Sequence, residues 1–240
     1  MHLFYTPDID GNSYNLDEQE SKHAIRVLRL GRGDEVILVD GRGTWYKARI
    51  SEDNPKSCIL DIYSVKEDYL PLPYQLHIAI SPTKNNDRFE WFLEKATEIG
   101  ISGITPLLCQ RTERNRLKTA RLERILVSAM KQSLRAFKPV LHEPLSLKEF
   151  LSRPSGGSKC IAHCMPKERT FLSSLKKEGS YTFLVGPEGD FTEEEVQMAL
   201  ASGYRPLSLG PSRLRTETAG VHLCSAIQLL ESQTAGEGSL

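Results

Sequence analysis

Beyond residue 73, the chain alternates short apolar segments of strand length with longer amphipathic segments of helix length. The amphipathic segment 88–99 is followed by Gly100, and glycine commonly ends helices. Thr192 and Glu195 have the spacing of a capping box, which predicts that a helix starts at residue 192. The alternation predicts an α/β domain over residues 74–233, with a mostly parallel sheet covered by helices. The expected strands are 76–80, 104–108, 159–162, 181–185 and 206–209, and the other expected helices are 88–99, 117–134 and 218–230.

The first 70 residues have a different pattern, which is mostly that of strands. Segments 35–39 and 44–50 are strand-like and flank Asp40-Gly41-Arg42-Gly43, a turn sequence. Segment 58–65 is another candidate strand. We therefore expect a separate β-rich module over residues 1–70.

The N-terminal part is also expected to contain one helix and to end in a linker. A helix over residues 17–28 would place three basic side chains, Lys22, Arg26 and Arg29, on one side. After it, Pro71 and Pro73 disfavour both a helix and a central strand. They predict a short, stiff linker between the two domains.

Several classes of protein are disfavoured by the composition. No apolar run approaches the roughly 18 residues that span a bilayer, and the N-terminus lacks the pattern of a signal peptide. The five cysteines are scattered and odd in number, which favours reduced thiols and a cytoplasmic location. Cys160, His163 and Cys164 lie close in sequence but lack a second ligand pair with zinc-like spacing, so no metal is expected.

The charges are segregated, although 31 basic and 31 acidic residues give a formal net charge of zero. Nine basic residues lie between Arg111 and Lys138, where only Glu113 and Glu123 oppose them. A second basic cluster lies between residues 22 and 49. Local basic surfaces on a neutral protein favour a polyanion held in a defined place. The alternative is that both clusters are solvated faces.

Two glycine-containing loops, 185–190 and 209–212, directly follow expected strands. In open α/β sheets, ligands bind outside the carboxyl ends of the strands, where glycine lets the backbone approach a ligand closely. Neither GxxxxGK[ST] nor GxGxxG is present, so nothing favours a triphosphate or a dinucleotide. A neutral, adenine-containing ligand fits such loops, while simple turns remain the alternative.

The residues of these loops are more specific than their spacing. The chain contains Val185-Gly186-Pro187-Glu188-Gly189, then Leu209-Gly210 followed by Leu214-Arg215-Thr216-Glu217-Thr218-Ala219. It also contains Glu94-Lys95-Ala96-Thr97-Glu98-Ile99-Gly100 and, near the N-terminus, His23, Val27-Leu28-Arg29 and Gly33-Asp34. In these segments, and in their order along the whole chain, it resembles the RsmE family of 16S rRNA uridine-N3 methyltransferases, within the SPOUT superfamily.

The resemblance implies a fold, a reaction and partners. The expected fold is a small PUA-like β-barrel that binds RNA, followed by a SPOUT-type α/β domain with a deep trefoil knot. Members of the family act as homodimers and use S-adenosylmethionine to methylate N3 of one uridine in the small ribosomal subunit. Because N3 lies on the base-pairing edge, the target uridine must be unpaired or splayed out.

The resemblance also assigns roles to residues of this chain. Arg215 would stabilise the uracil oxygens and Glu217 would handle or orient the proton, or else the two would pair and brace the loop. The residues expected to hold the cofactor are Leu184, Val185, Gly186, Pro187, Glu188, Gly189, Leu209, Gly210, Leu214, Thr218 and Ala219. The residues expected to bind RNA are Lys22, Arg26, Arg29, Arg42, Arg111 and Arg114.

Two positions depart from the pattern of the family. The loop is expected to read Gly-Pro-Glu-Gly-Gly, but Asp190 stands at the fifth place. The long helix is expected to carry Glu-Gln-Ser, but it carries Lys131-Gln132-Ser133, which excludes an acid at 131 and favours a phosphate contact. Two other functions remain open: a non-catalytic RNA-binding or ribosome-assembly factor, and a related methyltransferase that acts on another RNA.

Overall fold

The computed structural model describes residues 1–154, 156–165 and 170–232. The chain divides into two compact units, one formed by Met1–Pro71 with Val127–Lys138 and the other by Leu72–Leu126 with Pro139–Leu240. The division runs through helix α3 (Thr119–Gln132), so its two halves belong to different units. Residue 233, the last of the expected second domain, lies outside the described residues.

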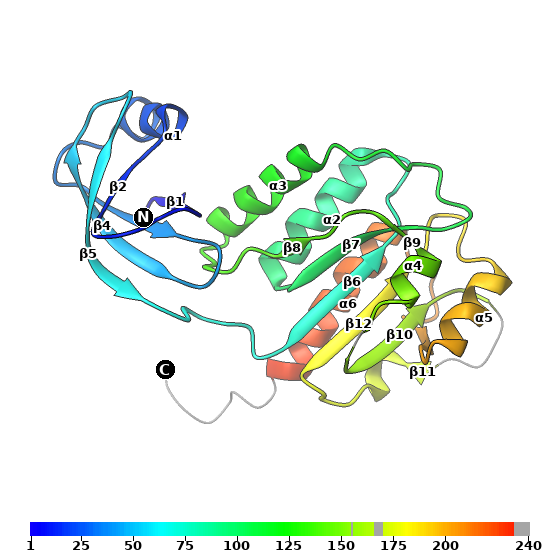
Figure 1. Ribbon diagram of the computed structural model, residues 1–240. Helices are drawn as coiled ribbons and strands as arrows, with labels where there is room; N and C mark the ends of the chain where they lie inside the picture. The colour runs from blue at the N-terminus through cyan, green and yellow to red at the C-terminus, as the bar shows by residue number, and fades with distance from the viewer. Residues whose placement is uncertain (155, 166–169, 233–240) are drawn as a thin grey trace. The chain divides into compact units, whose positions relative to one another are not determined.

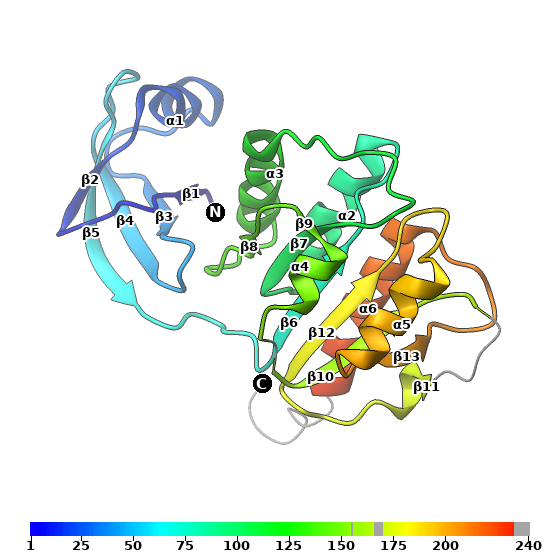
Figure 2. The same cartoon turned by 45° about the vertical axis from the view of Figure 1, so that its right-hand side comes forward.

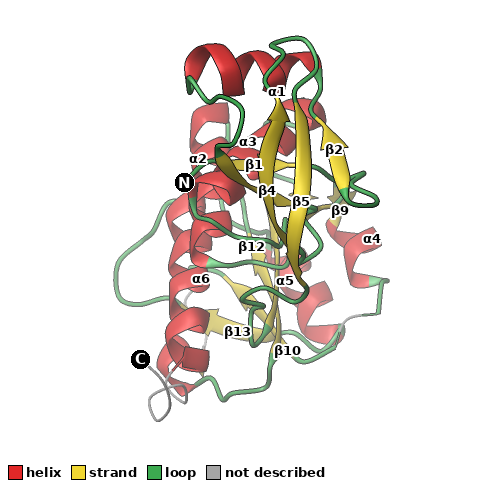
Figure 3. Cartoon of the chain, turned by 90° about the vertical axis from the view of Figure 1, so that its left-hand side faces the viewer, coloured by secondary structure: helices red, strands yellow, loops and turns green. Residues whose placement is uncertain are grey.

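The first unit is built on a five-stranded sheet with the order β1-β3-β4-β5-β2. β1 runs parallel to β3, and the other neighbours are antiparallel. Figure 3 shows β4, β5 and β2 side by side. The sequence predicted three of these strands; β1 and β2 have three residues each and were not predicted. The strands are β1 (Leu3–Tyr5), β2 (Ser13–Asn15), β3 (Glu35–Val39), β4 (Trp45–Glu52) and β5 (Ile59–Lys66).

The helix expected over residues 17–28 forms as two short pieces of different geometry. α1 (Glu18–Lys22) is capped by Asp17, whose side chain accepts from the Glu20 amide at 2.8 Å. A π-helical turn, His23–Val27, follows directly. Arg29 lies beyond it with a φ of 58°, in the left-handed region. The prediction that Arg29 shares a helix face with Lys22 and Arg26 is therefore wrong, because the wider turn ends the helix first.

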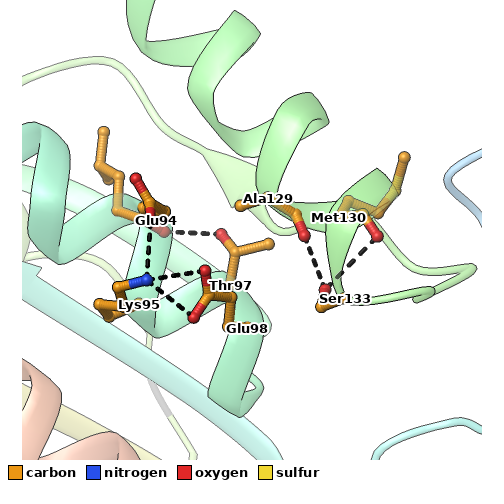
Figure 4. Close-up of polar contacts among 8 residues, drawn as sticks. Glu94, Lys95, Thr97, Glu98, Ala129, Met130 and Ser133 are labelled. Carbon is orange, nitrogen blue, oxygen red and sulfur yellow. Dashed lines mark hydrogen bonds and ion pairs between the residues drawn. The ribbon is translucent and has the colours of Figure 1, made fainter.

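The end of α3 and the residues after it pack within the first unit. Met130 and Ala136 are buried in one cluster with Val39 and Trp45. The Ser133 hydroxyl donates to the carbonyl of Ala129 at 2.7 Å, back along the helix (Figure 4). This apolar packing gives the small sheet a helical cover from a distant part of the sequence.

The second unit is an α/β domain with one long parallel sheet of order β11-β13-β10-β12-β6-β7-β8, and β9 pairs with β7 (Figure 1). Every pairing in it is parallel, which confirms the predicted mostly parallel sheet. Its strands are β6 (Gln75–Ile80), β7 (Gly103–Leu108), β8 (Val140–Leu141), β9 (Leu145–Ser146), β10 (Ser158–Ala162), β11 (Thr170–Phe171), β12 (Ser180–Val185) and β13 (Arg205–Ser208).

Helices cover both faces of this sheet (Figure 2). On one face, α2 (Asn86–Ile99), the start of α3 and α6 (Thr216–Ser232) bury a core that includes Phe92, Leu126 and Leu223. On the other face, α4 (Leu147–Leu151) and α5 (Glu193–Ala201) pack on a second cluster. A 3₁₀ turn, Leu172–Ser174, follows β11. The capping box of Thr192 and Glu195 is present as predicted.

Helices α2 and α6 lie in direct contact. Gly220 on α6 allows this approach, because a Cβ built there would stand 2.5 Å from the Phe92 ring. The contact places the first turns of the two helices beside each other, where Arg88 of α2 lies near Glu217 of α6.

Candidate active site

The carboxyl ends of β6 and β12 meet at one edge of the sheet. Ile80 is aligned with Val185, and the Ser81 amide donates to the Val185 carbonyl at 2.9 Å. The loops that follow these two strands, 81–85 and 186–192, therefore start side by side. This is the edge at which ligands bind in open α/β sheets.

Loop 186–192 is folded around Phe191, whose ring closes on Gly186. A Cβ on Gly186 would stand 2.9 Å from that ring, so a larger residue there would displace the loop. Asp190 has a φ of 62°, a conformation that favours glycine. Its carboxylate accepts from the amides of Cys164 and Phe191, each at 2.8 Å. The aspartate thus maintains the turn by its own hydrogen bonds, where the family was expected to use glycine.

Two neighbouring segments hold the outer side of this loop. The Arg111 guanidinium donates to the Gly189 carbonyl at 2.7 Å and reaches the Phe191 carbonyl at 3.5 Å. The Lys84 amide donates to the Glu188 carboxylate at 2.9 Å. Arg111 was predicted to bind RNA; in the structure, its guanidinium is bound to the main chain of loop 186–192.

The second predicted loop joins the first through one buried hydrogen bond. The Thr216 hydroxyl, at the start of α6, donates to the Gly186 carbonyl at 3.0 Å. The connection from Leu209 to Arg215 leads into this helix, and Gly210 within it has a φ of 125° with open space around it. The structure therefore brings together the two segments that the sequence predicted to form one cofactor site.

A pocket of about 590 Å³ lies where α6 begins. Of the residues predicted to hold the cofactor, Leu214 and Thr218 line it, and both predicted catalytic residues, Arg215 and Glu217, line it too. The other predicted cofactor residues lie outside its lining: Leu184, Val185, Gly186, Pro187 and Ala219 are buried, Leu209 is half-buried, and Glu188, Gly189 and Gly210 are exposed.

Helix α2 contributes three further residues to this pocket, Asp87, Arg88 and Trp91, and the loop contributes Arg213. Sequence reasoning missed the α2 residues because they lie far from residues 213–218 in the chain. The order of the elements could have identified them. The expected helix 88–99 follows the expected strand 76–80, so the start of the helix lies at the edge of the sheet where ligands bind.

Glu217 is the buried charge of the pocket. It is only 6% exposed, and its nearest cation is Arg88, with 3.8 Å between Nε and Oε1. Its other oxygen, Oε2, is buried without a hydrogen-bond partner among the described residues. Arg215 is exposed. The alternative that Arg215 and Glu217 pair with each other is therefore wrong, because Arg88 from α2 occupies that role.

The residues 94–100 that contributed to the resemblance stabilise α2 rather than line the pocket. Lys95 forms ion pairs with Glu94 at 2.7 Å and Glu98 at 2.9 Å, and the Thr97 hydroxyl donates to the Leu93 carbonyl at 2.7 Å (Figure 4). Hydrogen bonds to these two glutamates raise the pKa of Lys95. This cluster strengthens the helix that presents Arg88 and Trp91.

The predicted RNA-binding residues of the first unit are exposed and differ in their partners. Lys22 pairs with Glu18 at 2.6 Å, and Arg26 lies beside Lys22 in the lining of a depression of about 610 Å³. Arg42 reaches Asp40 at 3.3 Å. Burial raises the pKa of Asp40, but hydrogen bonds from Arg42 and Thr44 outweigh it and lower the pKa overall.

Lys131, the second departure from the family pattern, lies in the lining of the same depression. Its ammonium pairs with Glu20 at 3.0 Å and lies 5.5 Å from the centre of the Phe4 ring. Its charge is therefore paired within the unit, and its role as a phosphate contact stays a prediction.

Basic residues of the second unit line a smaller pocket of about 250 Å³. Arg114, predicted to bind RNA, lies there with Arg116 and Lys118. Arg121 is bound to Glu90 by two hydrogen bonds, at 2.6 and 2.8 Å. A bidentate pair of this kind fixes the guanidinium, which makes Arg121 part of the wall rather than a free cation.

All five cysteines are free, and only Cys164 is exposed. Burial raises the pKa of the Cys109 and Cys224 thiols well above the ordinary value. Over residues 1–154, 156–165 and 170–232, no three His, Cys, Asp or Glu side chains group to hold a metal ion. Within those same ranges, no helix has the length and apolar character to cross a membrane.

Comparison with protein families matches residues 70–228 to an RNA methyltransferase domain and residues 16–63 to an RNA methyltransferase PUA domain. A relative from Synechocystis sp., named ribosomal RNA small subunit methyltransferase E, is 32% identical over 216 residues, which are 86% of this chain and 70% of the relative.

Similar solved structures are also those of rRNA methyltransferases. A probable rRNA methyltransferase from Porphyromonas gingivalis is 40% identical, with a TM-score of 0.91 over 97% of this chain and 99% of that chain. Ribosomal RNA small subunit methyltransferase E from Neisseria gonorrhoeae, bound to S-adenosyl methionine, is 29% identical, with a TM-score of 0.87 over 96% and 98%.

Proposed function

The chain belongs to the RNA methyltransferase family, with a PUA domain before the methyltransferase domain, and we propose that it methylates N3 of a uridine in 16S rRNA. The methyl donor is S-adenosylmethionine, which the similar Neisseria gonorrhoeae enzyme binds. The observation that carries the proposal is the hydrogen bond from Thr216 to Gly186. It joins the two loops whose residues resemble the family, beside a pocket that Glu217 lines.

The residues present suit this cofactor. The exposed glycines Gly189 and Gly210 can present main-chain groups to the polar edges of an adenosine, and Leu214 supplies an apolar wall. Open space around Gly210 lets the ligand approach the backbone. When bound, S-adenosylmethionine supplies an activated methyl group on a sulfonium sulfur.

The protein's own task is to position the base and to manage one proton. Methylation forms a bond from N3 to the methyl carbon, breaks the sulfur–methyl bond and releases the N3 proton. Glu217 is our candidate to accept or orient that proton, because its oxygen Oε2 is buried and has no partner among the described residues. Arg215, exposed at the same pocket, is our candidate to stabilise the charge that grows on the uracil oxygens.

Further parts of the proposal come from the family. We infer that the second unit carries the trefoil knot of the SPOUT fold, that the PUA-like unit is a closed barrel, and that two chains form a homodimer in the cytoplasm. The wholly parallel sheet and the contact of α6 with α2 are compatible with the knot. The proposed RNA contacts are Lys22, Arg26, Arg29, Arg42 and Arg114, with Lys131 as an additional candidate.

Mass spectrometry of 16S rRNA from cells with and without the protein tests the proposed function. We expect one uridine to lose a methyl group when the gene is deleted, and the purified protein to restore it with S-adenosylmethionine. An unchanged methylation pattern would contradict the proposal. Calorimetry with S-adenosylmethionine separates an inactive relative, which would not bind the cofactor, from an enzyme that acts on a different RNA.

A further inference from the structure

Trp91 is a large aromatic side chain in the wall of the pocket rather than in the core. It is 41% exposed, although the next two residues of the helix, Phe92 and Leu93, are fully buried. The only other tryptophan, Trp45, is buried in the first unit and stacks on Tyr69 with 4.2 Å between ring centres. An exposed ring in a pocket that charged side chains also line is a surface on which a planar base can stack.

Arg88 and Glu217 place a donor and an acceptor next to this ring. Arg88 and Trp91 lie on the same side of α2, where side chains three apart are neighbours. The Arg88 side chain is 40% exposed, and Glu217 Oε1 lies 3.8 Å from its Nε. The other oxygen of Glu217 has no partner among the described residues. A buried oxygen without a donor is costly, and a ligand N–H would relieve that cost.

The edge of uracil matches this arrangement. Its N3–H is a donor that lies between two carbonyl acceptors, so a carboxylate and a guanidinium can bind it together. Cytosine carries an acceptor at N3 and an amino donor at C4, which reverses both requirements. A buried acceptor such as the Glu217 carboxylate discriminates against a base that leaves it unsatisfied.

We propose that Trp91, Arg88 and Glu217 form the subsite that binds and selects the target uracil. The inference rests on the proposed function and extends it, because it assigns the base to the α2 side of the pocket. Trp91 stacks on the base, Glu217 accepts from N3–H, and Arg88 donates to a neighbouring carbonyl oxygen. As N3 loses its proton, charge grows on that oxygen beside the guanidinium.

Fluorescence of Trp91 tests the subsite directly. The variant Trp45→Phe leaves Trp91 as the only tryptophan. We expect a short RNA with a single unpaired uridine to quench its emission, and an RNA of the same length with cytidine at that place to bind at least fivefold more weakly. Equal quenching by both RNAs, or none by either, would overturn the assignment.

Methyl-transfer kinetics test the same residues in the active protein. Trp91→Ala should raise the KM for RNA about tenfold and leave the affinity for S-adenosylmethionine within twofold, and Trp91→Phe should restore most of the loss. Arg88→Gln should lower kcat for RNA, whereas Arg153→Gln, at an exposed position just after α4 and outside the pocket lining, should not. Thermal melts of each variant establish that it is folded.

The failures of the two proposals are distinguishable. If the unmodified protein neither binds S-adenosylmethionine nor methylates rRNA, the proposed function is wrong, whatever the fluorescence shows. If it does both but Trp91→Ala keeps its KM for RNA, or loses cofactor affinity in parallel, the proposed function stands and the uracil subsite is wrong.

Discussion

The Thr216 hydroxyl donates a hydrogen bond to the Gly186 carbonyl at 3.0 Å, and this contact joins two loops that lie 30 residues apart. It holds the start of α6 against the loop after β12, so the two segments of the expected cofactor site are joined by a buried hydrogen bond.

Thr216→Val keeps the volume of the side chain but removes the donor. We expect it to cost about 1 kcal/mol, and therefore to weaken S-adenosylmethionine binding by about fivefold. Isothermal titration calorimetry measures the change, with Thr216→Ser as the matched variant that keeps the hydroxyl. Equal affinities for the valine and serine variants would show that the bond does not organise the site.

Glu217→Gln and Arg215→Ala test the candidate catalytic residues. If Glu217 handles the proton, its replacement should lower kcat by roughly 100-fold or more. Loss of Arg215 should lower kcat by about tenfold, because its charge is exposed. Single-turnover assays with saturating cofactor measure both, and Glu143→Gln, an exposed change on the same unit, is the control. Near-normal turnover with intact cofactor binding would reject both roles.

Gly220→Ala should destabilise the protein through the contact of α6 with α2. The added methyl group would stand 2.5 Å from the Phe92 ring, so the two helices must separate or the ring must turn. Overpacking of this kind costs about 1–3 kcal/mol. Urea unfolding measures it, and Gln228→Ala at an exposed position of the same helix should change little.

Acid should weaken the fold through His77. Burial, with a smaller contribution from the nearby His142, lowers the pKa of His77 from 6.5 to about 4. Between those values the unfolded chain binds a proton that the folded chain does not, so stability is full above pH 6.5 and falls towards pH 4. The loss from this group is at most about 3 kcal/mol. Urea unfolding at pH 7 and pH 5 should show a smaller difference in His77→Gln than in the unmodified protein.

Arg26→Ala combined with Arg29→Ala should weaken RNA binding and flatten its dependence on salt. Each phosphate contact that is lost should reduce the slope of log K against log salt by about 0.7–0.9. Filter binding over a salt series measures the slope, with Lys56→Ala as the control, because Lys56 is an exposed cation of the same unit outside the basic cluster of residues 22–49. A change in thermal stability alone would make the two arginines structural.

The longer elements of the fold could be predicted because their apolar residues repeat with a clear period. Helix α2 was predicted to within two residues at its start and correctly at its end, where Gly100 adopts a φ of 126°. Strands such as β8 and β9 have two residues each, too few for any period to appear. The π-helical turn at His23–Val27 has the same apolar residues that an α-helix would bury, so sequence could not separate the two.

The candidate site was predictable where it is continuous in sequence. The loops around Gly186 and Gly210 follow strands that were themselves predicted, which put both at one edge of the sheet. Arg88 and Trp91 reach the pocket only because α6 packs on α2. The periodicity of apolar residues within each helix does not predict which other helix it contacts. The pairing of Glu217 was missed for the same reason, since its partner comes from another helix.

The hydrogen bonds of Asp190 connect two segments that follow different strands of the sheet. Its carboxylate ties the amide of Cys164, beyond the end of β10, to the loop after β12, a link that a glycine would not provide. Replacement by glycine would remove the φ strain and break this link in the same step. A change to glycine, the residue expected in relatives, would therefore be neutral only in a chain that held the segment around Cys164 by other contacts.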